Sequence, residues 1–304
     1  MKDRIACVIV GQEQTVDLVL TAILANGHVL IEGVPGVAKT LLARLTARLI
    51  DADFSRIQFT PDLMPSDVLG TTVFNMKTNG FDFHQGPIFA DIVLVDEINR
   101  APAKTQAALF EVMEERQISI DGTTHRMGDL YTILATQNPV EQEGTYKLPE
   151  AQLDRFLMKI TMDYPSLEEE VNILERHHTN AALVKLDDIT PAITKEEVLS
   201  LRAFMNQVFV DRTLLQYIAL IVQQTRTSKA VYLGASPRAS VAMLQSSKAY
   251  ALLQGRDFVT PEDIKFVAPY VLQHRLILTA EAEMEGYSPV KVTQRLIDKV
   301  EVPK

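Results

Sequence analysis

The sequence predicts an α/β fold, in which a parallel sheet is flanked by helices, followed by a smaller all-helical domain. In the first half of the chain, short apolar strands alternate with helical segments, which is the order typical of a parallel sheet. After Pro165 the apolar periodicity is almost wholly helical. We therefore place a boundary near Pro165, which divides the chain into residues 1–165 and 166–304.

The α/β part begins with apolar residues at helical spacing over residues 13–26. A short β-branched strand at residues 29–33 enters a glycine-rich turn, and a helix without Gly or Pro follows at residues 39–50. Later strands are expected at residues 54–60, 91–96, 130–138 and 155–165, with a helix at residues 104–116.

The helical part opens with a capping box formed by Ser166 and Glu169. Thr260 marks another helix start, because Pro261 and two acids follow it. Helices are expected over residues 195–210, 212–227, 237–254, 261–278 and 289–300.

Composition excludes some classes of function. The net charge is −9 and the pI about 5.2, so the surface repels phosphate backbones and no nucleic-acid partner is expected. No apolar run approaches the ~18 residues that span a bilayer, so we expect no membrane segment. The one cysteine, Cys7, lies in an apolar stretch and is expected to be buried. A cytoplasmic protein fits these features.

The strongest motif is GVPGVAKT at residues 33–40, between a predicted strand and a predicted helix. This is the context of a P-loop, in which backbone N–H groups and a helix N-terminus bind phosphates. Lys39 would neutralise the β- and γ-phosphates of ATP, and the Thr40 hydroxyl would ligate Mg²⁺. Ala38 occupies the last glycine position of the consensus, and the alternative is a chance glycine-rich turn.

A second motif places Asp96 and Glu97 at the carboxyl end of an apolar strand, where ligands bind on open α/β sheets. A buried carboxylate is costly without a cation. Asp96 would hold Mg²⁺ through water, and Glu97 would orient and polarise the attacking water. The alternative, a solvated strand end, loses weight because both motifs are present in this order.

Three further residues are candidates for contact with the reacting phosphate. Asn138 follows the next apolar strand and could position the water or contact the γ-phosphate, although Asn-Pro is also an ordinary turn marker. Arg155 could stabilise transition-state charge on a neighbour's ATP, or form an ion pair with Asp154 or Glu150. Arg238 lies in the first turn of a helix capped by Ser236, where a cation opposes the helix dipole; the alternative is a solvated arginine.

With these motifs, the chain resembles MoxR-type AAA+ ATPases, close to the magnesium-chelatase and minichromosome-maintenance branch. The resemblance runs from Gly11 to the C-terminus and is most specific over residues 86–115. In this family Ala often stands at the position of Ala38. The resemblance implies a P-loop AAA+ core with a helical lid domain, and ATP with Mg²⁺ as cofactors.

The resemblance also implies a role for each matching residue. Asp96 and Glu97 match Walker B, Asn138 sensor 1, Arg155 the arginine finger and Arg238 sensor 2. Gly11 and Gln12 resemble the segment that packs near the adenine. The P-loop residues expected to contact the nucleotide are Gly33, Val34, Pro35, Gly36, Val37, Ala38, Lys39, Thr40 and Leu41.

Members of this family form rings, usually of six subunits, with the nucleotide between neighbours. Arg155 would then act on the next subunit's ATP, whereas Arg238 could act in its own subunit or across the interface. Residues 73–86 and 116–127 predict hairpins that turn at Asn79-Gly80 and Asp121-Gly122. In related motors such hairpins face a pore and move substrate.

We therefore expect an ATP-hydrolysing, chaperone-like ring that remodels or activates a protein partner, with a von Willebrand A-type protein as a candidate. The hairpins contain few basic residues, which favours a protein over DNA. The alternatives are the motor subunit of a metal chelatase-like complex and, with less support, a DNA motor. The adjacent His177 and His178 are interpreted as a solvated helix end.

Overall fold

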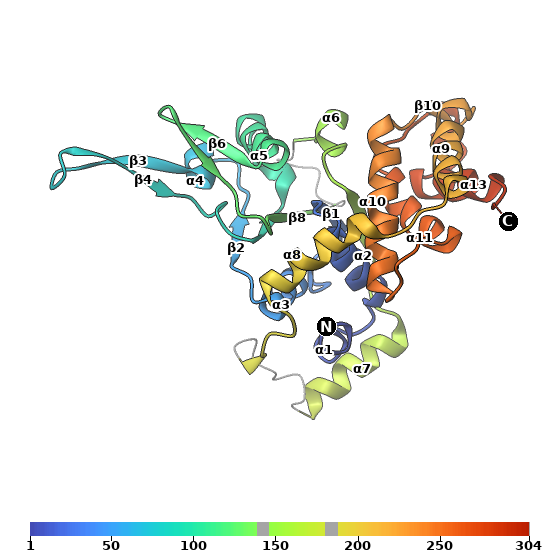
Figure 1. Cartoon of the computed structure of the whole chain (residues 1–304), viewed down its shortest axis with the longest axis horizontal. Coiled ribbons are helices and arrows are strands. Elements are labelled where there is room, and N and C mark those ends of the chain that lie inside the picture. Colours follow the sequence, from blue (N-terminus) through green and yellow to red (C-terminus); the bar gives the residue numbers. More distant parts are fainter. Residues whose placement is uncertain (139–145, 180–187, 304) are drawn as a thin grey trace. The chain divides into compact units, whose positions relative to one another are not determined.

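The computed structural model describes residues 1–138, 146–179 and 188–303, which form two compact units (Figure 1). The first unit contains residues 1–16, 30–148 and 161–199, and the second contains residues 17–29, 149–160 and 200–304. No helix among the described residues is long and apolar enough to cross a membrane.

The α/β part of the chain contains a five-stranded sheet in the order β2-β5-β8-β1-β9. The pairs β2–β5 and β5–β8 are parallel, and every residue of β5 is buried, as a strand covered on both faces requires. The strands are β1 (Val29–Gly33), β2 (Phe54–Gln58), β5 (Ile92–Asp96), β8 (Thr132–Gln137) and β9 (Met158–Met162). The predicted α/β class with a parallel sheet is confirmed.

Helix α3 (Lys39–Ile50) has the predicted bounds and contacts β5. It presents Leu42, Leu45 and Leu49 to the interior at the spacing of an amphipathic helix. The other helical segments that begin in this unit are α1 (Lys2–Ala6), α2 (Glu13–Leu24), α4 (Pro65–Leu69), η1 (Ile98–Arg100), α5 (Ala103–Glu115), α7 (Leu167–His178) and α8 (Lys195–Phe204).

Two antiparallel hairpins are present where they were predicted, and β3–β4 extends away from the sheet in Figure 1. Strands β3 (Gly70–Asn75) and β4 (Gly80–Gln85) are joined by a four-residue loop, so Asn79 belongs to a longer turn than expected. Strands β6 (Gln117–Ile120) and β7 (Thr123–Arg126) turn at Asp121-Gly122, both with positive φ.

The second unit is mainly helical and carries a small two-stranded sheet. Its core includes the buried residues Tyr217, Ile221, Met243, Val267 and Leu296. Its elements are α6 (Glu150–Leu153), η3 (Met205–Gln207), α9 (Arg212–Thr227), β10 (Val231–Leu233), α10 (Pro237–Leu253), α11 (Pro261–Leu272), β11 (Ile277–Leu278), α12 (Ala280–Met284) and α13 (Pro289–Lys299).

Two local expectations were wrong, and a third was right in position but not in its hydrogen bond. Cys7 is exposed, because α1 turns its Ile5 inward instead. The helix expected over residues 261–278 ends at Leu272, and Ile277 and Leu278 pair with β10. Ser236 is the N-cap residue of α10, but its hydroxyl donates to the Asp154 carboxylate instead of accepting from the helix. The boundary at Pro165 stays a prediction.

Candidate functional site

The turn between β1 and α3 has the backbone of a phosphate-binding loop. Gly36 has φ +89° and Ala38 has φ +61°, both in the left-handed region. A Cβ on Gly36 would meet no atom within 4 Å, so glycine serves its conformation there. A Cβ on Gly33 would lie 2.7 Å from the carbonyl oxygen of Met162, so glycine serves the close approach of β9. Ala38 adopts the left-handed conformation at a cost of about 1 kcal/mol.

Lys39 folds back over this turn. Its Nζ donates to the carbonyl oxygens of Gly33 at 2.5 Å and of Val34 at 3.3 Å. The ammonium therefore lies beside the loop whose N–H groups precede α3. A fixed cation next to a helix N-terminus is the arrangement that binds phosphate charge.

A cavity of about 280 Å³ adjoins the loop. Five of the expected contacts line it, namely Gln12, Gly36, Val37, Ala38 and Leu41, and most of its wall is apolar. A largely apolar pocket with a few polar groups suits a flat aromatic base. The remaining lining residues are Val8, Ile9, Val10, Pro165, Ile173, Arg176 and His177.

Helix α7 closes this cavity and was not expected to take part in the site. Its predicted capping box is confirmed: Glu169 N donates to Ser166 Oγ, and Ser166 N donates to Glu169 Oε2 at 2.7 Å. Gly11 has φ +73°, and a Cβ there would lie 2.4 Å from the Glu169 carboxylate. Arg176 donates to the carbonyl oxygens of Ala6 and Cys7, which ties the N-terminal turn to α7.

Asp96 ends the buried strand β5 and is itself buried. Its Oδ1 accepts from Thr136 Oγ1 at 3.0 Å, and its Oδ2 accepts from Arg56 Nε at 2.6 Å. Thr136 Oγ1 also accepts from Glu97 N at 3.0 Å, so one hydroxyl from β8 contacts both acidic residues. Arg56 therefore supplies the positive charge that this buried carboxylate needs in the structure.

Glu97 follows Asp96 in the left-handed conformation, with φ 57° and ψ 51°. A non-glycine residue in this region is uncommon and is found preferentially at functional sites. Glu97 Oε2 accepts from Gln58 Nε2 at 2.9 Å and from Arg100 Nε at 2.9 Å. With this backbone conformation, the Glu97 carboxylate contacts Gln58 of β2 and Arg100 of η1.

Asn138 lies directly after β8 and is buried. Because β8 pairs with β5 in parallel, with Ala135 opposite Val95, the ends of the two strands lie side by side. The register therefore brings the segment that contains Asn138 to the edge where the acid pair lies. Pro139, the second residue of the Asn-Pro turn signal, lies outside the described residues.

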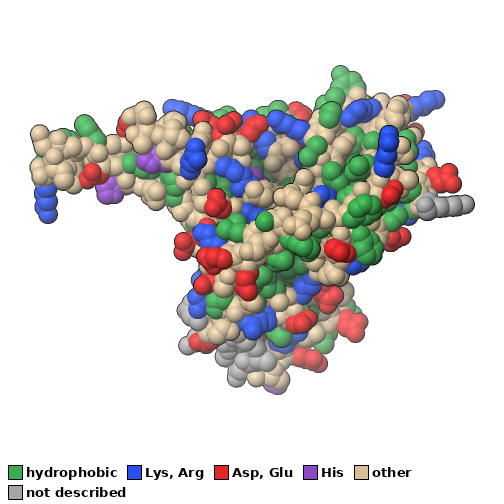
Figure 2. All heavy atoms as spheres, viewed as in Figure 1, with side chains coloured by type: hydrophobic (Ala, Val, Ile, Leu, Met, Phe, Trp, Pro, Cys, Tyr) green, Lys and Arg blue, Asp and Glu red, His purple; other side chains and the backbone are tan. Residues whose placement is uncertain are grey.

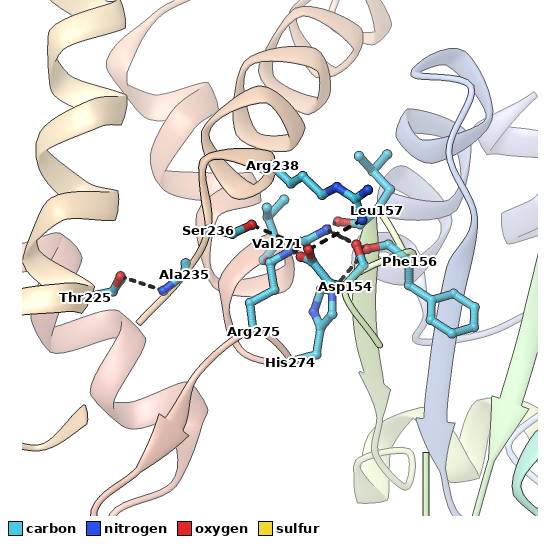
Figure 3. Close-up of polar contacts among 10 residues, drawn as sticks. All are labelled: Asp154, Phe156, Leu157, Thr225, Ala235, Ser236, Arg238, Val271, His274 and Arg275. Atoms are coloured by element: carbon cyan, nitrogen blue, oxygen red, sulfur yellow. Dashed lines mark hydrogen bonds and ion pairs between the residues drawn. The ribbon is translucent and has the colours of Figure 1, made fainter. Parts of the chain in front are cut away.

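The remaining two candidates, Arg155 and Arg238, belong to the second unit. Arg155 lies in the turn after α6 and is half-buried. The Arg238 side chain is 62% exposed, and its Nη1 lies 4.0 Å from Asp154 Oδ2 (Figure 3). The same carboxylate is bound by Arg275 Nε at 2.7 Å. A buried, charged cluster therefore adjoins both candidate arginines.

Sequence reasoning missed Arg56, Gln58, Thr136 and Arg176. Arg56 and Gln58 lie on β2, Thr136 lies on β8 and Arg176 lies on α7. The alternation in residues 54–60 indicated a strand but not which strand it would adjoin. His177 is exposed, as interpreted, and it also lines the cavity. Among the described residues no cluster of three or more His, Cys, Asp or Glu forms a further metal site.

Comparisons with known proteins identify the class of this fold and site. Residues 28–158 match the ATPase family associated with various cellular activities (AAA), and residues 223–298 match the AAA lid domain. The crystal structure of a provisionally assigned ATPase from Cytophaga hutchinsonii superposes with a TM-score of 0.90 at 42% identity, covering 99% of this chain and 93% of that one. The fold is thus an AAA nucleotide-binding core with a helical lid.

Named relatives identify the family within this class. The Chaperone MoxR1 of Mycobacterium tuberculosis is 44% identical, covering 98% of this chain and 80% of the relative. The Protein MoxR of Methylorubrum extorquens is 30% identical, covering 92% and 88%. The protein YeaC of Bacillus subtilis, of uncharacterised function, is 48% identical, covering 99% and 93%. The chain belongs to the MoxR family of AAA+ ATPases, for which nucleotide binding and ATP hydrolysis are implied.

Proposed function

We propose that this protein is a Mg²⁺-dependent ATPase that hydrolyses ATP to ADP and phosphate and uses the reaction to remodel or activate a protein partner. One observation carries the catalytic part. The turn that contains Lys39 follows β1, and the acid pair Asp96 and Glu97 lies at the end of β5. In the sheet only β8 separates these two strands. This is the edge at which open α/β sheets bind ligands.

In this proposal each residue has a distinct task. Lys39 exchanges its bonds to the Gly33 and Val34 carbonyls for bonds to phosphate oxygens. Thr40 and Asp96 hold Mg²⁺, which would neutralise phosphate charge when bound. Glu97 orients a water and takes up its proton, and Asn138 supplies a fixed amide beside it. Gln12 and the cavity beside α7 hold the base, and the adjacent Gly11 shapes the turn that presents Gln12.

Arg155 and Arg238 complete the proposed site. Arg155 acts as an arginine finger on the ATP of the next subunit in a ring. Arg238 contacts the γ-phosphate, in its own subunit or across the interface. The helical second unit then acts as the lid that hydrolysis moves. Ring assembly, with six subunits as the expected number, is part of the proposal.

A protein is the proposed partner because the β3–β4 hairpin exposes apolar side chains. Met76 is 88% exposed and Phe81 73% exposed, and the Phe81 ring contacts Phe74 edge-on at 5.3 Å. On the face drawn in Figure 2, basic and acidic side chains are interspersed. The name of the M. tuberculosis relative supports a chaperone role. A von Willebrand A-type protein is the proposed candidate for this partner. The proposed location is the cytoplasm.

The proposal predicts that Lys39→Ala and Glu97→Gln fail at different steps. Lys39→Ala should lose ATP binding because alanine has no ammonium group to contact the phosphates. Glu97→Gln should bind ATP normally and lower the single-turnover rate by about 10²-fold or more, because an amide cannot accept the proton of the water. Nucleotide binding and phosphate release measure the two steps, and EDTA should stop hydrolysis in the native protein.

Exposed residues of α5 provide matched controls, Lys104→Ala and Glu111→Gln. Both should bind and hydrolyse ATP as the native protein does. If Lys39→Ala and Glu97→Gln also hydrolyse ATP at the native rate, the site has been assigned wrongly.

A further inference from the structure

The turn that contains Arg155 lies outside any helix or strand. It spans residues 154–157, between α6 and β9. Its N–H groups find local partners: Arg155 N donates to Gln152 O at 3.2 Å and Phe156 N donates to Leu153 O at 3.1 Å. A turn of this kind leaves carbonyl oxygens that another part of the protein must satisfy.

The side chain of Arg275, which lies in the turn after α11, satisfies three of them. Arg275 Nη2 donates to Asp154 O at 3.2 Å and to Phe156 O at 2.7 Å, and Nη1 donates to Leu157 O at 3.2 Å. Its Nε donates to the Asp154 carboxylate at 2.7 Å. The guanidinium therefore binds backbone carbonyl oxygens on both sides of Arg155. Arg275 is buried, with 4% of its side chain exposed, so it is shielded from water.

Neighbouring residues extend this contact (Figure 3). His274 Nε2 donates to Phe156 O at 3.1 Å, and Gln273 Nε2 donates to Lys159 O at 2.5 Å. On the other side, Ser236 Oγ donates to Asp154 Oδ2 at 3.4 Å. The N-cap of α10 and the turn after α11 both bind the Asp154 carboxylate.

We propose that Arg275 is a positioning residue for Arg155, fixing the turn from which the finger reaches a neighbouring subunit's ATP. Asp154 is the second part of this device, because its carboxylate orients the guanidinium. The inference rests on the proposed role of Arg155 as a finger. A planar fork that spans three carbonyl oxygens and a carboxylate cannot be replaced by the single nitrogen of lysine. Transition-state contacts tolerate little displacement, and about 1 Å can cost 10²-fold in rate.

Three variants test the position of the finger: Arg275→Gln, Arg275→Lys and Asp154→Asn. In each we expect kcat to fall by about 10- to 100-fold, while KM for ATP and affinity for ADP change by less than about threefold. A loss of ATP binding, or a native kcat in folded Arg275→Lys and Asp154→Asn, overturns the inference. Arg212→Gln, on the exposed start of α9, is the matched control and should keep native values.

Mixed rings separate positioning from a merely structural effect. Lys39→Ala subunits cannot bind ATP but present an intact Arg155 turn. Adding them to Arg275→Gln subunits should restore several-fold of the lost ATPase rate, because each variant then supplies what the other lacks. No restoration overturns the inference. If Arg275→Gln does not fold, Arg275→Lys replaces it in the mixture.

The control mixture combines Lys39→Ala with Arg155→Ala and tests the proposed function itself. Restoration there, without restoration for the Arg275 variant, rejects the positioning role and leaves the finger intact. If the control mixture also fails, Arg155 does not act across an interface, and both ideas are wrong.

Discussion

At the scale of single residues, the site depends on backbone conformations that side chains disfavour. Ala38 and Glu97 both lie in the left-handed region without being glycine. Ala38 is the N-cap residue of α3 and Glu97 directly follows β5, so each lies at the boundary of a regular element in the proposed phosphate-binding site. Strain of this kind persists only where the surrounding structure imposes it.

The strain at Glu97 predicts a stability difference between two inactive variants. Glu97→Gly and Glu97→Ala both remove the carboxylate and its bonds to Gln58 and Arg100. Glycine adopts φ 57° without strain and alanine adopts it only at a cost, so Glu97→Gly should have a free energy of unfolding higher by about 0.5–1 kcal/mol. Urea unfolding of the two proteins measures this difference. Equal stability, or a more stable Glu97→Ala, would show that the backbone is not strained there.

At the scale of elements, the turn that follows α11 contacts the turn before β9. His274 is buried there and donates from Nε2 to the Phe156 carbonyl, which requires the neutral ring with its proton on that nitrogen. Burial lowers the pKa of His274 well below its usual 6.5, and the charge of Arg275 lowers it further.

This lowered pKa predicts an acid-sensitive contribution to stability. Below about pH 6.5 the unfolded imidazole takes up a proton and the folded one does not, so the unfolded state is favoured. The contribution is fully present above about pH 7. It is lost as the pH falls, by about 1.4 kcal/mol per pH unit, until the folded ring also protonates.

Unfolding of native protein and of His274→Gln, measured between pH 5 and 8, tests this expectation. His274→Gln should lose stability less steeply with acid, because glutamine does not titrate. The exposed His178→Gln should retain the native slope. A native slope in His274→Gln would mean that this imidazole is not held neutral.

At the scale of the whole molecule, the proposed activity needs a surface that meets another protein. The β3–β4 hairpin provides an exposed aromatic pair on a long antiparallel ladder, and Thr72 Oγ1 donates to Asp121 Oδ2 of the second hairpin at 2.6 Å. The two hairpins are therefore linked, so a partner that contacts one would act on both.

We predict that Phe81→Ser weakens capture of a partner by the Glu97→Gln protein in ATP. The Phe81→Ser variant lacks the apolar ring that a partner would bury. Loss of one aromatic side chain of this size commonly costs about 1–2 kcal/mol or more of binding free energy, roughly a tenfold loss in affinity. Quantitative pull-down from the source cells measures it. Tyr232→Ser is the control, since Tyr232 is 79% exposed on β10. Undiminished capture by Phe81→Ser would exclude the hairpin tip as the contact.

Local signals in the sequence predicted much of this fold. Contacts between residues that are far apart in the sequence could not be predicted. The bounds of α3 and α9 follow from apolar spacing and chain breaks, and the Ser166–Glu169 box from two nearby residues. Thr136 contacts Asp96 only because β8 lies beside β5, and strand order is not written in either strand. Arg275 lies 121 residues from Asp154, with no periodic pattern between them to indicate the contact.

The exposed Cys7 has a practical use. It is the single cysteine of the chain, so a thiol-reactive dye would attach at one position without any engineered mutation. Its neighbour Val8 lines the cavity beside the phosphate-binding loop, and its own carbonyl oxygen is held by Arg176 of α7. A change in the emission of a fluorophore on this thiol when ATP is added would therefore test, in the unmodified sequence, whether nucleotide binds at the proposed site.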